Sequence, residues 1–106
     1  MGPLHGLRVL DLCTEAGVYC TKLLTDLGAQ VIKVESLDGS PERRRPPFFK
    51  GDTASSLSFL HYNRNELSVT LGLALDEGRR LFHELVKASD IMVEDGLPPQ
   101  LGLNYE

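Results

Sequence analysis

Three consecutive arginines, Arg43, Arg44 and Arg45, are the residues with the most evident chemical potential. A planar guanidinium group can donate two hydrogen bonds to one phosphate, and these three groups stand together in a chain whose net charge is −4. The cluster fits two interpretations. It either contacts the phosphates of a ligand or forms a basic loop that is simply solvated.

Glu35 is a second candidate, because it ends the second of two apolar segments and lies about 20 residues after the end of the first. Dinucleotide-binding folds place at this position an acidic residue that bonds a ribose hydroxyl. The turn between these segments, Cys13 to Val18, lacks the G-x-G-x-x-G pattern that lets a backbone approach a pyrophosphate. A standard NAD site is therefore disfavoured. Glu35 is interpreted either as a ribose ligand or as an ordinary carboxylate at the end of a strand.

The thiols and imidazoles suggest no metal site. Cys13 and Cys20 are seven residues apart, which is not a C-x-x-C pattern, and we expect both to be buried free thiols. The three histidines, His5, His61 and His83, are scattered along the chain. No acidic residue forms a recognisable catalytic arrangement with a serine, cysteine or histidine, so we predict neither a metal site nor a catalytic residue.

The composition limits the classes of protein to consider. The chain has 106 residues, which suits one domain, and 42% of them are hydrophobic, which suits a folded one. Eleven basic against fifteen acidic residues disfavour a nucleic-acid partner. No apolar stretch approaches the roughly 20 residues that span a bilayer. We expect a cytoplasmic protein without nucleic-acid or membrane partners.

Hydrophobic patterning predicts the elements that must position these residues. Short branched apolar segments predict strands at residues 7–12, 30–35, 67–71 and 90–95. Two long helices are predicted from apolar residues at helical spacing, the first with Cys20, Leu23, Leu24 and Leu27 before Gly28, and the second with Gly78, Leu81, Phe82 and Leu85 after an N-cap at Asp76. Residues 36–55 are expected to form a long loop, and residues 56–62 a short helix.

This order of strands and helices predicts an α/β fold, a Rossmann-like parallel sheet with flanking helices. Ligands of such sheets bind beyond the carboxyl ends of the strands. We therefore expect a site formed by residues 13–17, the segment from Ser36 onward, residues 72–75 and residues 95–97.

Several stretches of the sequence, in their order and spacing, resemble a known family. They are G-L-R-V-L-D-L at residues 6–12, L-T-D-L-G-A-Q-V-I-K-V-E at 24–35, N-R-N at 63–65, A-S-D-I-M-V-E at 88–94 and L-G-L-N-Y-E at 101–106. Together they resemble the N-terminal part of the class III coenzyme A transferases, the family of formyl-CoA transferase and carnitine CoA-transferase. The resemblance implies that residues 1–106 are the CoA-binding, Rossmann-like start of the family's large domain.

The resemblance also implies a reaction. Members move CoA from an acyl-CoA to a carboxylic acid: an aspartate attacks the thioester to give a mixed anhydride, the CoA thiolate forms an enzyme thioester, and the acceptor acid completes the exchange. Members form homodimers of interlocked rings. CoA and acyl-CoA are substrates, and no permanently bound cofactor is implied.

The family's CoA contacts carry over to the expected strand ends. The matching positions are Glu15, Ala16, Ser36, Leu71, Gly72, Leu73, Ala74, Asp95, Gly96 and Leu97. Ser36 and Asp95 stand where arginine and asparagine are common, and Glu66-Leu67 replaces a basic pair. Arg43, with its two neighbours, is predicted to replace the lost phosphate contacts.

The length departs from the family most strongly, because members are several times longer and their nucleophilic aspartate lies downstream of every residue here. We expect a fragment that is inactive alone. The alternatives are a non-catalytic module that binds CoA or another nucleotide, and a relative of the acyl-CoA racemases.

Overall fold

Four parallel strands form one sheet in the order β3-β2-β1-β4. They are β1 (Arg8–Leu12), β2 (Gln30–Glu35), β3 (Leu67–Thr70) and β4 (Ile91–Glu94). The computed structural model describes residues 2–13, 17–51 and 56–95. The strand order is that of the first four strands of a Rossmann fold, whose direction of growth reverses between β1 and β4. The expected α/β class and the parallel sheet are confirmed.

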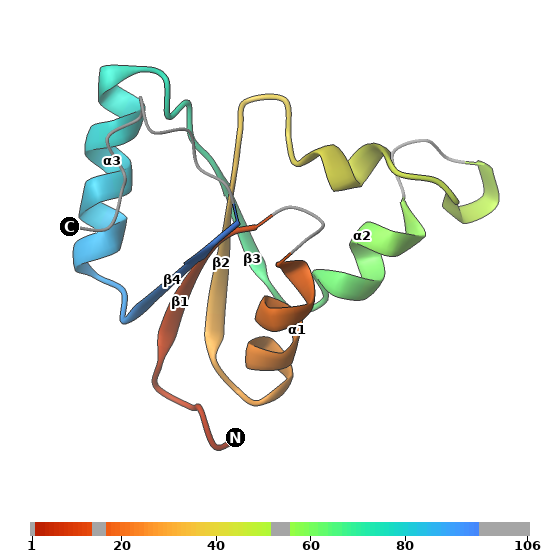
Figure 1. Ribbon diagram of the computed structural model, residues 1–106, viewed down its shortest axis with the longest axis horizontal. Coiled ribbons are helices and arrows are strands. Elements are labelled where there is room, and N and C mark those ends of the chain that lie inside the picture. The colour runs from red at the N-terminus through yellow and green to blue at the C-terminus, as the bar shows by residue number, and fades with distance from the viewer. Residues whose placement is uncertain (1, 14–16, 52–55, 96–106) are drawn as a thin grey trace.

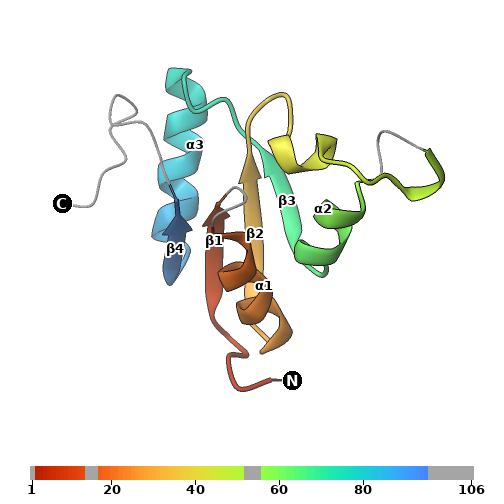
Figure 2. The same cartoon turned by 45° about the vertical axis from the view of Figure 1, so that its right-hand side comes forward.

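Helices cover both faces of this sheet. Figure 2 shows α1 (Val18–Asp26) in front of the sheet and α3 (Asp76–Lys87) behind it. The short α2 (Leu57–Tyr62) lies beyond the β3 edge, next to the single-turn helices η1 (Pro41–Arg44) and η2 (Phe49–Gly51) (Figure 1). Right-handed crossovers with alternate helices on opposite faces are characteristic of a doubly wound sheet.

The core divides between the two faces because successive side chains of a strand point to opposite sides. On the α3 side, Leu10, Leu71 and Phe82 are buried with the half-buried side chains of neighbouring strand residues. On the α1 side, Val9 and Val31 pack with Ala29. That second face also carries Asp11 and Lys33, so it is apolar at the amino ends of the strands and ionic at their carboxyl ends.

Two sequence predictions about α1 and the cysteines are wrong in part. The helix ends where Gly28 adopts φ +105°, as glycine permits. Leu24 of the predicted stripe packs on the core, but Val18 and Thr21 are the buried residues of the helix, and Leu23 and Leu27 are 42% and 45% exposed. The stripe that meets the sheet is therefore rotated from the predicted one. For the same reason Cys20 is exposed, and Cys13 is the buried thiol.

The helix starts and the long connection also differ from expectation. Leu75 is the N-cap of α3, and Asp76 is its first residue rather than its cap. Residues 36–51 are not a featureless loop, because Ser40 caps η1 and both Ser40 and Glu42 are buried. The short helix predicted at residues 56–62 is present, with the Ser56 side chain accepting a hydrogen bond from the Phe59 N–H group.

Candidate functional site

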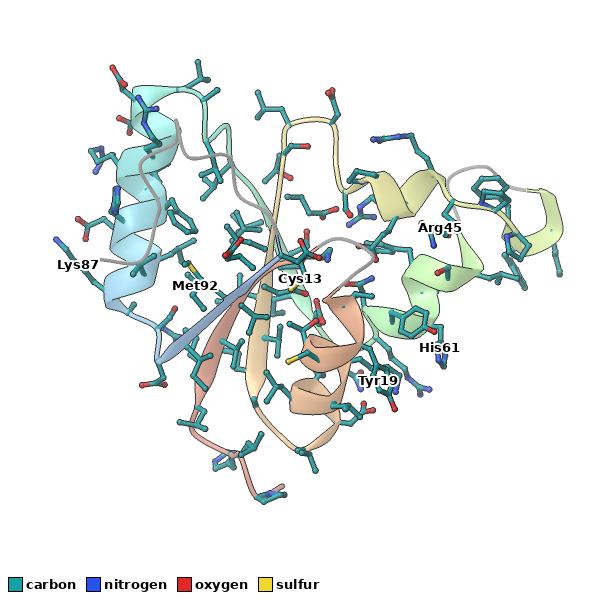
Figure 3. The ribbon with its side chains drawn as sticks, viewed as in Figure 1. Cys13, Tyr19, Arg45, His61, Lys87 and Met92 are labelled. Atoms are coloured by element: carbon teal, nitrogen blue, oxygen red, sulfur yellow. The ribbon has the colours of Figure 1, made fainter. Side chains whose placement is uncertain are left out.

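A cleft of about 410 Å³ opens at the carboxyl ends of β1, β2 and β3. Its lining residues come from the three strand ends and the start of η1: Leu12, Cys13, Lys33, Val34, Glu35, Ser36, Leu37, Ser40, Pro41, Leu71, Gly72, Leu73 and Ala74. Figure 3 shows Cys13 at the end of β1, where the chain leaves the sheet. Parallel sheets of this kind bind their ligands at the carboxyl ends of the strands, which is where this cleft lies.

Five of the predicted contact positions line this cleft together: Ser36, Leu71, Gly72, Leu73 and Ala74. Ser40 and Pro41 belong to the expected segment from Ser36 onward but were not named as contacts. They join the cleft at the start of η1, where the Ser40 N–H group donates to the Glu35 carboxylate at the end of β2. The signal available for them was the Ser-Pro start of a helical turn. Glu15, Ala16, Gly96 and Leu97 lie outside the described residues.

The charged side chains of the described cleft residues are Lys33 and Glu35, and both are committed to other parts of the protein. The buried Lys33 Nζ donates to the Cys13 carbonyl at 3.3 Å and lies 3.5 Å from Asp11 Oδ2. The wall that these residues leave for a ligand is mostly apolar side chain and backbone. Such a surface suits a flat ring system better than a phosphate.

Glu35 is held by donors on both of its carboxylate oxygens. Oε1 accepts from the Ser40 N–H group at 2.8 Å and from Arg43 Nε at 2.7 Å, while Oε2 accepts from Arg43 Nη2 at 2.8 Å and from Ser68 Oγ at 2.5 Å. The Arg43 guanidinium is the main reason that the pKa of this carboxyl falls to about 2. With this many internal donors, Glu35 is a structural carboxylate rather than a ribose ligand.

Arg43 is correspondingly occupied. Its guanidinium forms the two-pronged pair with Glu35 and lies 4.1 Å from the centre of the Phe59 ring. Arg43 is not among the described residues that line the cleft. The next residue, Arg44, is exposed, and its Nη1 donates to the Asp38 carbonyl at 3.0 Å. Of these two arginines, Arg44 is the more exposed.

Replacing Glu35 with glutamine is expected to lower the free energy of unfolding by about 2 kcal/mol at pH 7, because charge-assisted hydrogen bonds are lost. The pKa of Glu35 is lowered on folding, so its stabilisation is present above pH 4.5 and is lost as the pH falls toward 2. Urea unfolding at pH 7 and pH 3 checks this. The gap between wild type and variant should shrink at pH 3, whereas Glu77→Gln, which removes a solvent-exposed pair with Arg80, should have little effect at either pH. A gap that does not change with pH contradicts the prediction.

The Asp95 side chain links the segment that follows β4 to the start of α1, which follows β1. The Gly17 N–H group at the start of α1 donates to Asp95 Oδ2 at 2.9 Å. A helix N-terminus is where Rossmann folds hold a phosphate. Here the chain's own carboxylate occupies that position, which agrees with the absence of the glycine fingerprint from the preceding turn.

Three further observations concern the described residues. A hollow of about 480 Å³ lies at the amino ends of the strands. There the Arg8 side chain donates to the Gln30 side chain and to the Ala88 carbonyl, and the Asp90 carboxylate accepts from the Arg8 N–H group. Within residues 2–13, 17–51 and 56–95 there is no group of three or more histidine, cysteine or acidic residues that could hold a metal ion. The described helices include none that is long and apolar enough to cross a membrane.

The strand order and the cleft at the carboxyl ends of the strands define a Rossmann-like α/β class of domain. Comparison with known proteins makes the assignment specific, because the model of CoA-transferase family III matches residues 4–106. The chain belongs to this family.

Individual relatives agree with this assignment. The chain is 44% identical over 98 residues to the succinyl-CoA:mesaconate CoA-transferase of Haloarcula marismortui, which covers 90% of the chain and 25% of that protein. It is 40% identical to the succinyl-CoA:glutarate CoA-transferase of Mus musculus, over 100% of the chain and 25% of that protein. The chain thus spans about a quarter of the length of the curated relatives that it matches.

Solved structures share the fold. A CAIB/BAIF family protein from Brucella suis superposes with a TM-score of 0.87 at 37% identity, covering 98% of this chain and 29% of that one. A hypothetical protein from Mycobacterium tuberculosis gives 0.86 at 33% identity, covering 99% and 29%. The sheet and its flanking helices are therefore the family's architecture.

Proposed function

We propose that this chain forms the adenosine-binding end of the CoA site of a class III CoA-transferase. The observation that carries the proposal is the convergence of Ser36 and residues 71–74 on one cleft with apolar walls. Adenine offers two flat apolar faces and a polar edge, which matches such walls bordered by backbone groups. The phosphates of CoA would lie outside the cleft, toward the exposed Arg44 of η1, while Arg43 would act through Glu35 alone.

For the whole protein we propose the family's reaction, transfer of CoA from an acyl-CoA to a carboxylic acid through an aspartyl intermediate in a homodimer. The relatives named as succinyl-CoA transferases support this class of substrate. Residues 1–106 would supply CoA binding, and none of their described acidic residues is proposed as the nucleophile.

Calorimetric titration of the chain tests where CoA binds. Adenosine 3′,5′-bisphosphate should compete with CoA, whereas pantetheine should not, because the cleft is proposed to hold the adenosine end. Ala74→Trp should raise the Kd for CoA at least about tenfold, since Ala74 is exposed at the rim and an indole there fills the cleft.

The matched control is Ala88→Trp, the same substitution at an exposed residue that borders the hollow at the amino ends of the strands. This variant should bind CoA as the wild type does. Equal affinities of the two tryptophan variants, or competition by pantetheine, would reject the proposed site.

A further inference from the structure

A cluster of ionisable side chains is buried between the sheet and α1. Asp11 of β1 and Lys33 of β2 are paired directly across the two strands and are 0% and 2% exposed. The Cys13 N–H group donates to Asp11 Oδ1 at 2.8 Å, which satisfies that oxygen. Asp11 Oδ2 is buried without a hydrogen-bond partner, because Lys33 Nζ stays 3.5 Å away and donates to the Cys13 carbonyl.

Glu66 extends this cluster from the residue before β3. Both of its carboxyl oxygens are buried and receive no hydrogen bond. The carboxyl lies within hydrogen-bonding reach of Asp11 and of the Thr21 hydroxyl. The Thr21 hydroxyl donates to the Val18 carbonyl at 3.0 Å, and its effect on Glu66, which favours the ionised form, is the smallest of those acting on that group. Burial and the neighbouring Asp11 carboxylate, which oppose ionisation of Glu66, are the larger effects.

The cluster contains more acid than base. Lys33 is a cation that acts on both Asp11 and Glu66. Glu42 of η1 adds a further buried carboxyl, which Asp11, Lys33 and a second cation, Arg45, all influence. Cys13 adds no charge, because burial raises the pKa of its thiol to about 12. Two ionised carboxylates in contact away from water would repel each other, whereas one proton between them makes a donor and an acceptor.

We propose that Glu66 and Asp11 share one proton, held on Glu66 and donated to Asp11 Oδ2, and that this proton makes the domain sensitive to alkaline pH. The O–H group fills the acceptor that Lys33 leaves unsatisfied. Removing the proton strains the contacts of Asp11 and Lys33 with the Cys13 backbone, which borders the cleft. The inference concerns the folded chain itself and holds whether or not CoA is the ligand of that cleft.

Burial, followed by the neighbouring Asp11 carboxylate, raises the pKa of Glu66 from 4.5 to about 8. In the unfolded chain the proton is lost near pH 4.5, so between these values the folded state holds a proton that the unfolded state has released. The ratio of folded to unfolded protein should consequently fall about tenfold for each pH unit from 4.5 to 8 through this group, and the effect should level off above pH 8.

Unfolding of the full 106-residue chain by urea between pH 5 and 9 tests the proposal with three proteins: wild type, Glu66→Gln and Glu84→Gln. The Glu66 variant should gain stability relative to wild type by about tenfold per pH unit up to pH 8. Glu84 is exposed on α3, so its variant should follow the wild type at every pH. The contribution of Glu42 cancels because all three proteins contain it. A constant ratio between wild type and Glu66→Gln would overturn the proposal.

A second measurement covers the case in which Glu66→Gln does not fold. Carboxyl carbon chemical shifts of the wild type should show Glu66 titrating well above 4.5, with the Asp11 carboxyl responding at the same pH. Titration of Glu66 near its ordinary value would refute the shared proton. A raised Glu66 pKa with no response from Asp11 would refute it as well, because burial alone would then be the cause.

Discussion

Replacing Gly78 with alanine should destabilise the domain by about 3 kcal/mol, although glycine-to-alanine changes inside a helix usually stabilise by about 1 kcal/mol. Gly78 is buried in the first turn of α3, where the helix crosses the turn that follows β3. A Cβ atom there would stand 2.0 Å from the Gly72 carbonyl oxygen and 2.6 Å from its carbon. Both contacts are with backbone, so no side-chain rotation relieves them, and either α3 or residues 71–74 must move.

The displaced segment forms one wall of the cleft, so Gly78→Ala should also weaken CoA binding in calorimetric titration. Urea unfolding gives the change in stability, with Glu84→Ala as the matched control at an exposed position of the same helix. The control should be as stable as the wild type or slightly more so, since alanine favours helix. A Gly78→Ala protein with wild-type stability and CoA affinity would show that α3 does not press on the cleft wall.

Phe82→Ala should cost about 3–5 kcal/mol, the usual penalty for deleting a buried aromatic ring. Phe82 is 1% exposed and is the most deeply buried large side chain of α3, with Leu85 of the same helix also packed against this core. It packs with Leu10 and Leu71, and the half-buried Leu12 and Leu73 surround this group. Because three of these leucines also line the cleft, the cavity left by the ring would weaken the floor of the site as well as the core.

Leu81→Ala is the appropriate comparison for Phe82→Ala, since Leu81 precedes Phe82 in α3 but is 41% exposed. Thermal or urea unfolding should show a loss below about 1 kcal/mol for this control. Equal losses for the two variants would contradict the placement of Phe82 in the core. With so small a sheet, the loss of Phe82 could remove most of the stability of the chain.

The fold was largely predictable because it depends on local patterns. Branched apolar runs such as residues 30–35 predict strands, and the regular alternation of strand and helix leaves few arrangements other than a right-handed parallel sheet. Gly28 could be predicted as a helix end, since the positive φ that ends the helix is a local property of that residue. The positions of the cleft residues at strand ends follow from the same topology.

Other features could not be predicted because they depend on partners distant in the sequence. Arg43 was expected to contact a phosphate, but Glu35 binds its guanidinium from eight residues away. Of the predicted apolar stripe of α1, Leu24 packs on the sheet, but Val18 and Thr21 are the buried residues of the helix, and the strands on that face carry the buried Asp11 and Lys33. Both differences involve charged side chains whose positions and partners are set by the folded chain rather than by the local sequence.

The sequence by itself determined the order of the elements, the α/β class and the family, since each is encoded in residue types and spacings along the chain. Only the tertiary structure decided which charges are internal. Asp11, Lys33, Glu35 and Glu66 resemble surface residues of any strand or loop in the sequence, but the register of β1 against β2 and the entry into β3 bury them together. The physical reason is that burial and hydrogen bonding depend on three-dimensional neighbours, and these govern whether a charged group is free to bind a ligand or is needed to hold the fold.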